Sequence, residues 1–145
     1  LLLEGDPLPE PVAKASELAR KKDKRILVMW GSKEQQAAMK KLTQGKDLRR
    51  YVSYEYEVVG LTREEEPELA EDHAASAAGP LLAVLDAGGK RIARLDAKDL
   101  DAAGMKAFLE KHAVPQKDAE ETLARALKEA QRTKRNVLVH LGAPW

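Results

Sequence analysis

The sequence predicts an α/β fold in which a central mixed sheet of four strands is flanked by helices. Short apolar runs without charge, typical of strands buried on both faces, alternate with segments whose apolar residues recur every three or four positions. Helical crossovers place strands in parallel, whereas the short turn Asp86–Gly89 closes an antiparallel hairpin, so the sheet is mixed. A further helix and strand follow this sheet as a C-terminal extension.

Composition limits the classes of function that this chain can have. It is 43% hydrophobic and 34% charged, a balance typical of a globular protein. A formal net charge of +1 provides no electrostatic reason to expect a nucleic acid as partner. No apolar run approaches the roughly 20 residues of a membrane span. The absence of cysteine excludes disulfides, thiolate metal sites and cysteine nucleophiles from this chain.

The first elements are an entry segment, a helix and a strand. Glycine and prolines within residues 1–10 predict an extended N-terminal segment. Helical spacing of apolar residues predicts a helix over 11–22, ending in the basic run Arg20-Lys21-Lys22, where positive charge suits the helix dipole. The apolar run 26–30, bounded by Gly31, predicts a strand buried on both faces.

Two capping boxes predict the starts of the next helices. Ser32 with Gln35 opens a helix that continues to about Leu42. Tyrosine and valine enrichment with partial alternation predicts a second strand over 51–59. Thr62 with Glu65 opens a further helix, which we expect to reach about residue 75.

The following segment contains the predicted hairpin and one more helix. Gly79-Pro80 interrupts the chain before a third strand over 81–85, and a fourth strand follows over 90–95. Helical periodicity predicts a helix over 99–112, with Met105 and Phe108 on its apolar side.

The C-terminal extension begins after a linker at 113–117. Asp118 with Glu121 is typical of a helix start, and apolar residues at helical spacing predict one stripe on that helix. That stripe consists of Leu123, Leu127 and Ala130. The apolar run Asn136–Leu141 predicts one more strand.

This extension is similar to the beginning of the chain. Residues 25–31 align with residues 136–142 at an offset of 111, and each run is preceded by an amphipathic helix and a basic turn. Domain-sized spacing favours tandem domains. The alternative is that any helix–strand pair looks alike at this level of comparison.

Two segments resemble the thioredoxin family. Gly142–Trp145, after an apolar strand, resembles the approach to a thioredoxin active site, where a strand leads into Trp-Cys-x-x-Cys at the start of a helix. Gly79-Pro80 with the hairpin at Asp86 resembles that family's cis-proline loop, in which Pro80 would be the cis-proline. The resemblance implies a thioredoxin-like domain over 11–112 and the start of a second one over 118–145.

The resemblance also implies that the first domain has lost the family's chemistry. When Gly31 is aligned with Gly142, the two cysteine positions fall on Gln35 and Ala38. Disulfide exchange requires a thiolate, which neither side chain can form. No catalytic residue, metal site or cofactor is therefore expected in this chain; its three histidines show no metal-ligand spacing.

Three hypotheses about function remain open. A groove between the start of the helix (Ser32, Gln35) and the Gly79-Pro80 loop would bind a protein or an extended peptide; alternatively, Ser32 and Gln35 only cap their helix. The chain could instead be the inactive N-terminal part of a tandem thiol–disulfide oxidoreductase whose Cys-x-x-Cys follows Trp145. The strand Asn136–Leu141 would join a sheet edge or form a homodimer. The resemblance and the non-Met start favour an exported bacterial protein over a cytoplasmic one.

Overall fold

The computed structural model describes residues 8–62, 64 and 79–140. The chain divides into two units, Leu1–Val114 and Pro115–Trp145, and the boundary falls inside the predicted linker. The helix predicted to follow Thr62, the residues Gly142–Trp145 and most of the N-terminal segment lie outside the described residues.

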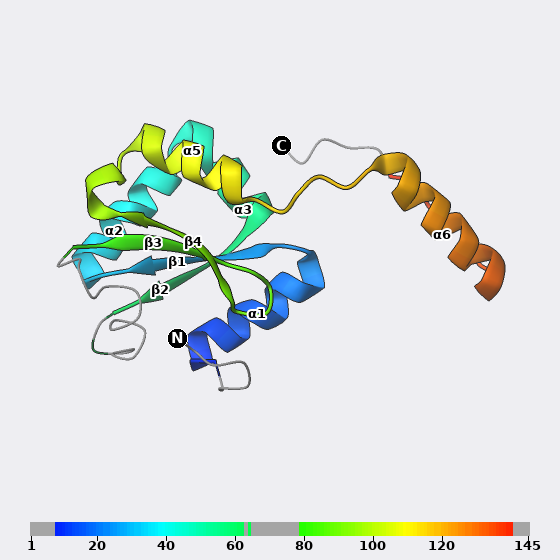
Figure 1. The fold of residues 1–145 in the computed structure, drawn as a ribbon, viewed down its shortest axis with the longest axis horizontal. Helices are drawn as coiled ribbons and strands as arrows, with labels where there is room; N and C mark the ends of the chain where they lie inside the picture. The colour runs from blue at the N-terminus through cyan, green and yellow to red at the C-terminus, as the bar shows by residue number, and fades with distance from the viewer. Residues whose placement is uncertain (1–7, 63, 65–78, 141–145) are drawn as a thin grey trace. The chain divides into compact units, whose positions relative to one another are not determined.

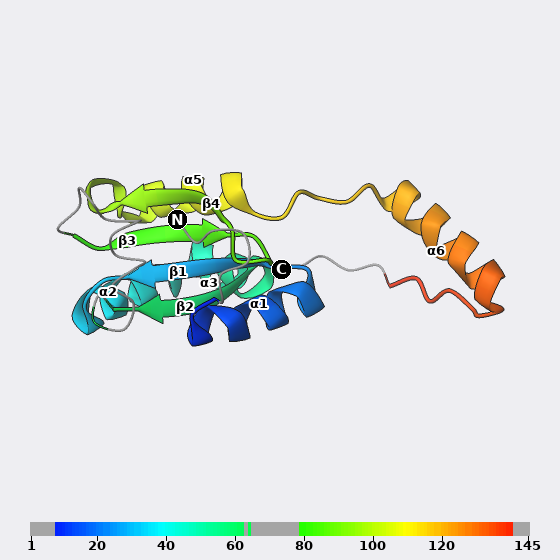
Figure 2. The same ribbon diagram turned by 60° about the horizontal axis from the view of Figure 1, so that its bottom comes forward.

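The first unit contains a four-stranded mixed sheet, as the sequence predicts. Its strands are β1 (Arg25–Trp30), β2 (Tyr56–Leu61), β3 (Leu81–Leu85) and β4 (Arg91–Asp96), in the order β2-β1-β3-β4 (Figures 1 and 2). β1 is parallel to β2 and antiparallel to β3, and β4 is antiparallel to β3. The crossover from β1 to β2 and the hairpin therefore occur as predicted, whereas the second expected crossover is wrong, because β3 runs antiparallel to β1 and not parallel to it.

Helices cover both faces of the sheet (Figure 1). Helix α1 (Glu10–Lys22) packs on one face, and α2 (Lys33–Thr43), α3 (Lys46–Glu55) and α5 (Ala102–His112) pack on the other. Successive strand residues point to opposite faces. Accordingly, Ile26 of β1 joins the apolar cluster under α1, whereas its neighbour Leu27 joins the cluster under the other three helices. β1 is thus buried on both sides.

The hairpin turn forms with the residues predicted for it. The Asp86 carboxylate accepts hydrogen bonds from the backbone N–H groups of Gly88 (2.8 Å) and Lys90 (2.9 Å). Gly89 has a φ of +90°, which strongly favours glycine. The turn therefore closes through one aspartate side chain and one glycine.

The strand predicted over 51–59 is wrong in its first half. Residues up to Glu55 are helical in α3, and the strand begins only at Tyr56. Leu48 and Val52, one helical turn apart, are buried in the cluster with α2 and α5. Packing of this helical face overrides the strand preference of Tyr51 and its neighbours.

The helix predicted from residue 99 begins later. Ala97–Asp99 form a short 3-10 helix, and α5 starts at Ala102. The Asp101 side chain accepts a hydrogen bond from the Gly104 N–H (2.7 Å) and so caps the helix. The residue that provides a cap, and not the start of the apolar spacing, sets this boundary.

The second unit contains helix α6 (Ala119–Thr133). The predicted cap is confirmed, because the Asp118 carboxylate accepts a hydrogen bond from the Glu121 N–H (2.8 Å). The strand predicted over Asn136–Leu141 is wrong for residues 136–140, which form no regular structure, and Leu138 is 94% exposed. A strand needs a hydrogen-bonding neighbour, and these residues pair with none of the described strands.

None of the helices described by the structure is long and apolar enough to cross a lipid bilayer.

Candidate functional site

The junction between β1 and α2 is built around Gly31. Its backbone φ is +152°, a conformation that L side chains rarely adopt. A β-carbon added there would lie 2.7 Å from Oε1 of Gln35 and 3.3 Å from Cβ of Pro80. Glycine therefore allows the start of α2 and the loop before β3 to approach each other closely.

The start of α2 is closed by the predicted capping box. The Ser32 backbone N–H donates to Oε1 of Gln35 (2.9 Å), and the Gln35 N–H donates to Oγ of Ser32 (3.2 Å). These reciprocal hydrogen bonds satisfy donors that a helix leaves without intrahelical partners. The capping box predicted at Ser32 and Gln35 is thus confirmed.

Glu34 adds a negative charge to the same turn. Its carboxylate accepts a hydrogen bond from the Ser32 hydroxyl (2.9 Å). Hydrogen bonds from its own backbone N–H and then from Ser32 lower the pKa of the Glu34 carboxyl below its usual value. The ionised Glu34 carboxylate therefore occupies the first turn of α2, and its negative charge disfavours the binding of an anionic ligand at this helix terminus.

The loop before β3 differs in one respect from the resemblance. The peptide bonds of the described residues are all trans, so the expectation that Pro80 is a cis-proline is wrong. A trans bond is favoured before proline by about 0.5–1 kcal/mol, and the ring already reaches Gly31 in this form. Gly79 lies against Ala97, because a β-carbon added at Gly79 would be 2.9 Å from the Ala97 Cβ.

The four residues predicted for the groove lie close to one another around Gly31. Gln35 and Pro80 both border Gly31, Ser32 is bonded to Gln35, and Gly79 directly precedes Pro80. Gln35 lies in the first turn of α2 and is half-buried, whereas Ala38 lies in the second turn and is exposed. Neither side chain can carry redox chemistry. The Pro80 ring therefore lies beside the first turn of α2, whose polar residues Ser32 and Gln35 are hydrogen-bonded to each other.

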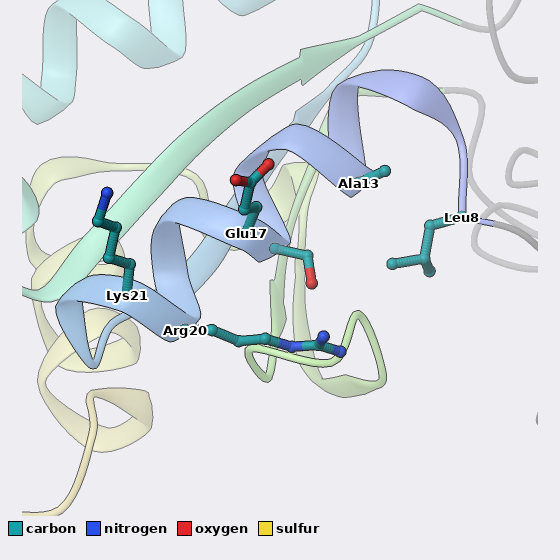
Figure 3. A pocket seen from close by; sticks show the side chains of 6 residues that line it. Leu8, Ala13, Glu17, Arg20 and Lys21 are labelled. Carbon is teal, nitrogen blue, oxygen red and sulfur yellow. The ribbon is translucent and has the colours of Figure 1, made fainter.

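The sequence did not predict a pocket beside α1 (Figure 3). This open pocket has a volume of about 570 Å³ and is lined by Leu8, Ala13, Ser16, Glu17, Arg20 and Lys21. The Ser16 hydroxyl (2.6 Å) and Nε of Arg20 (3.2 Å) both donate to the Ala87 carbonyl oxygen, which ties α1 to the hairpin. A serine on the buried stripe of α1 was the only signal of this contact in the sequence.

The histidines and acids do not assemble a metal site within the described part of the chain. The His112 ring packs against Phe108, with 4.9 Å between ring centroids. Burial, followed by the nearby charges of Lys111 and Arg25, lowers the pKa of His112. His140 is exposed in the second unit, and His73 lies outside the described residues.

We predict that Ser32→Ala lowers the free energy of unfolding by about 1 kcal/mol, because it removes the acceptor for the Gln35 N–H. Urea unfolding followed by circular dichroism measures this cost. Lys41→Ala, at an exposed position in the third turn of the same helix, is the control and should change the free energy by less than about 0.5 kcal/mol. Equal costs for the two variants would contradict the capping role of Ser32.

Comparison with solved structures places this arrangement in a known fold. The chain is similar to the crystal structure of a disulphide isomerase from Xylella fastidiosa Temecula1, with a TM-score of 0.58 and 19% sequence identity. The similarity covers 77% of this chain and 97% of the other. No family model and no curated protein matches the sequence. The chain has a thioredoxin-like fold, as its sequence resemblance implies.

Proposed function

We propose that this chain is a non-catalytic thioredoxin-like module that binds an extended peptide or a partner protein at the junction of β1, α2 and the Pro80 loop. The carrying observation is that Gln35 of α2 and Pro80 before β3 meet around Gly31 although the chain has no cysteine. A thioredoxin-like fold without a thiolate cannot exchange disulfides. Such a fold can still bind a ligand at the surface formed by Gln35 and Pro80.

The chemistry of this surface favours contacts of shape and hydrogen bonding over charge. Pro80 is half-buried and presents a rigid apolar ring, and Ala38 is an exposed small residue one helical turn after Gln35 on α2. The negative charge of Glu34 is already bound within its own turn. A short extended peptide with small or apolar side chains fits this surface better than an anionic ligand does.

Titration with a library of extended peptides, followed by amide chemical shifts, tests the proposal. We expect the largest shifts at Gly31, Ser32 and Gly79, and Gln35→Trp should weaken binding at least about tenfold because the indole fills the space beside Pro80. Ala37→Trp is the matched control, because position 37 is rotated by about 200° from position 35 on the same helix.

The control variant should bind as the unchanged chain does, and both variants should retain the circular dichroism spectrum of the fold. Shifts centred on the pocket beside α1, or equal weakening by the two tryptophans, would assign peptide binding elsewhere. Absence of binding across the library would overturn the proposal.

A second candidate function is favoured by a detail of two helix ends. At the end of α1, Asp23 adopts a left-handed conformation, and the Lys24 N–H donates to the Ala19 carbonyl oxygen (2.9 Å). The end of α6 repeats this 111 residues later: Lys134 is left-handed, and the Arg135 N–H donates to the Ala130 carbonyl oxygen (2.9 Å). This agreement supports the interpretation of the second unit as the start of another thioredoxin-like domain.

In this second candidate, the chain is the inactive N-terminal part of a tandem thiol–disulfide oxidoreductase whose Cys-x-x-Cys follows Trp145. Peptide mapping of the natural protein reads the residues after Trp145. Reduction of insulin disulfides by that protein, and its loss when the first of those cysteines is replaced by serine, would support an oxidoreductase. A natural protein without cysteine would eliminate it.

A further inference from the structure

We propose that the apolar face of α6 is a sheet-packing face, and that the natural protein continues beyond Trp145 to supply the sheet that covers it. This face consists of the predicted stripe, Leu123, Leu127 and Ala130, together with Ala126, and is called the α6 stripe from here on. The inference rests on the tandem arrangement of the second candidate function, but it does not require that the second domain be redox-active.

The stripe matches the buried face of α1 residue by residue. Four residues of α1 are buried: Val12, Ala15, Ser16 and Ala19. At the offset of 111 that aligns the two helix ends, these four positions become Leu123, Ala126, Leu127 and Ala130. All four are apolar in α6, and the polar Ser16 is replaced by leucine. The two helices therefore carry the same face at the same distance from the same cap.

The outward faces correspond as well. Lys14, Glu17 and Lys21 of α1 are exposed, and their counterparts in α6 are Arg125, Lys128 and Arg132. Charged residues thus occupy the same solvent side of both helices. The agreement therefore includes three charged positions on the solvent side and is not confined to a shared content of leucine and alanine.

In the first unit, this face has a defined partner. Val12, Ala15 and Ala19 form one cluster with residues from β1, β2 and β3, including Ile26 and Val28. Because α1 leads directly into β1 through the capped turn, the helix packs back on the strand that follows it. In the first unit, a helix with this apolar face and this C-terminal cap therefore packs on the sheet that begins with the next strand.

In the second unit, the same face lacks cover from that unit's own described residues. No residue of α6 is buried, and Leu127 is 48% exposed. Leu138 and Val139 are also exposed, whereas their counterparts Leu27 and Val28 are buried in β1. An apolar helix face and an apolar segment that are both exposed favour the interpretation that a further element covers them.

Hydrogen exchange on the natural full-length protein tests this inference. The α6 amides should exchange at least about a hundredfold more slowly there than in the 145-residue chain, because the covered helix opens only with its domain. Leu127→Lys in the full-length protein should remove this protection, whereas Gln131→Lys, at the position equivalent to exposed Arg20, should preserve it. Leu127→Ala provides a milder second variant if the lysine variant does not fold; its α6 amides should lose part of the protection.

Each outcome decides the question. Protection of α6 that Leu127→Lys abolishes and Gln131→Lys preserves supports the inference, and it does so even if no cysteine pair follows Trp145. Fast exchange of α6 in the full-length protein overturns it, as does a natural protein that ends at Trp145. Protection that rises with protein concentration also overturns it, because a second copy would then cover the stripe.

Discussion

Leu82→Ala is expected to lower the free energy of unfolding of the first unit by about 3 kcal/mol. Leu82 lies in the central strand β3, is fully buried and pairs with Met29 on one side and Leu95 on the other. It joins the cluster formed by α2, α3 and α5. Truncation leaves a cavity that two paired strands and the helices above them cannot close without losing other contacts.

Urea unfolding monitored by Trp30 fluorescence measures the effect of Leu82→Ala. Leu123→Ala is the control within the same chain, because Leu123 is 41% exposed on α6. The control should change the free energy of unfolding by less than about 0.5 kcal/mol, since Leu123 belongs to neither apolar cluster of the first unit. A cost for Leu82→Ala no larger than that of the control would show that β3 is not the centre of the core.

The double variant Gln35→Cys, Ala38→Cys is expected to acquire redox chemistry that the natural chain lacks. The two positions are one helical turn apart, so their Cα atoms are separated by about 5 Å, a distance that a disulfide spans. Position 35 is in the first turn of α2, where the helix dipole stabilises a thiolate. The pKa of the thiol there should fall below 8.5, but by less than about one unit, because the neighbouring Glu34 carboxylate opposes the helix dipole.

Alkylation rates as a function of pH measure that pKa, and insulin reduction measures the activity. The matched control is Ala37→Cys, Lys40→Cys, which has the same spacing one half-turn further along α2 and also faces solvent. Its thiols lie beyond the first turn and should keep an ordinary pKa, because the field of the helix end has fallen off there. Equal pKa values in both pairs would show that the start of α2 no longer stabilises an anion.

Local sequence signals were sufficient for most of the sheet and the helix caps. β1 and β3 are uninterrupted apolar runs, and such runs are stable as strands only when both faces are covered. The Ser32–Gln35 box and the Asp118 cap depend on hydrogen bonds within four residues, so their spacing alone predicts them. The mixed α/β architecture follows from these elements and the hairpin.

Two predictions were wrong where distant residues decide the structure. Residues 51–55 are rich in tyrosine and valine, yet they are helical because Leu48 and Val52 pack against α2 and α5. Residues 136–140 have the composition of a buried strand but form none, since a strand exists only with a hydrogen-bonding neighbour. Residue composition gives a segment a preference for the strand conformation, but a strand forms only when the segment pairs with a neighbouring strand.

For the candidate site, the sequence by itself determined the absence of cysteine and the cap at Ser32. The alignment of Gln35 and Ala38 with redox positions stays a prediction from the family resemblance. Only the tertiary structure decided that Pro80 reaches Gly31 by a trans peptide bond, and that the Tyr56 hydroxyl donates to the Leu109 carbonyl oxygen (2.6 Å) inside the core. The physical reason is the separation along the chain of the residues that interact. Caps and turns form between near neighbours in the chain, whereas contacts such as these join residues about fifty apart. Such contacts form only when the whole sheet has brought its loops together.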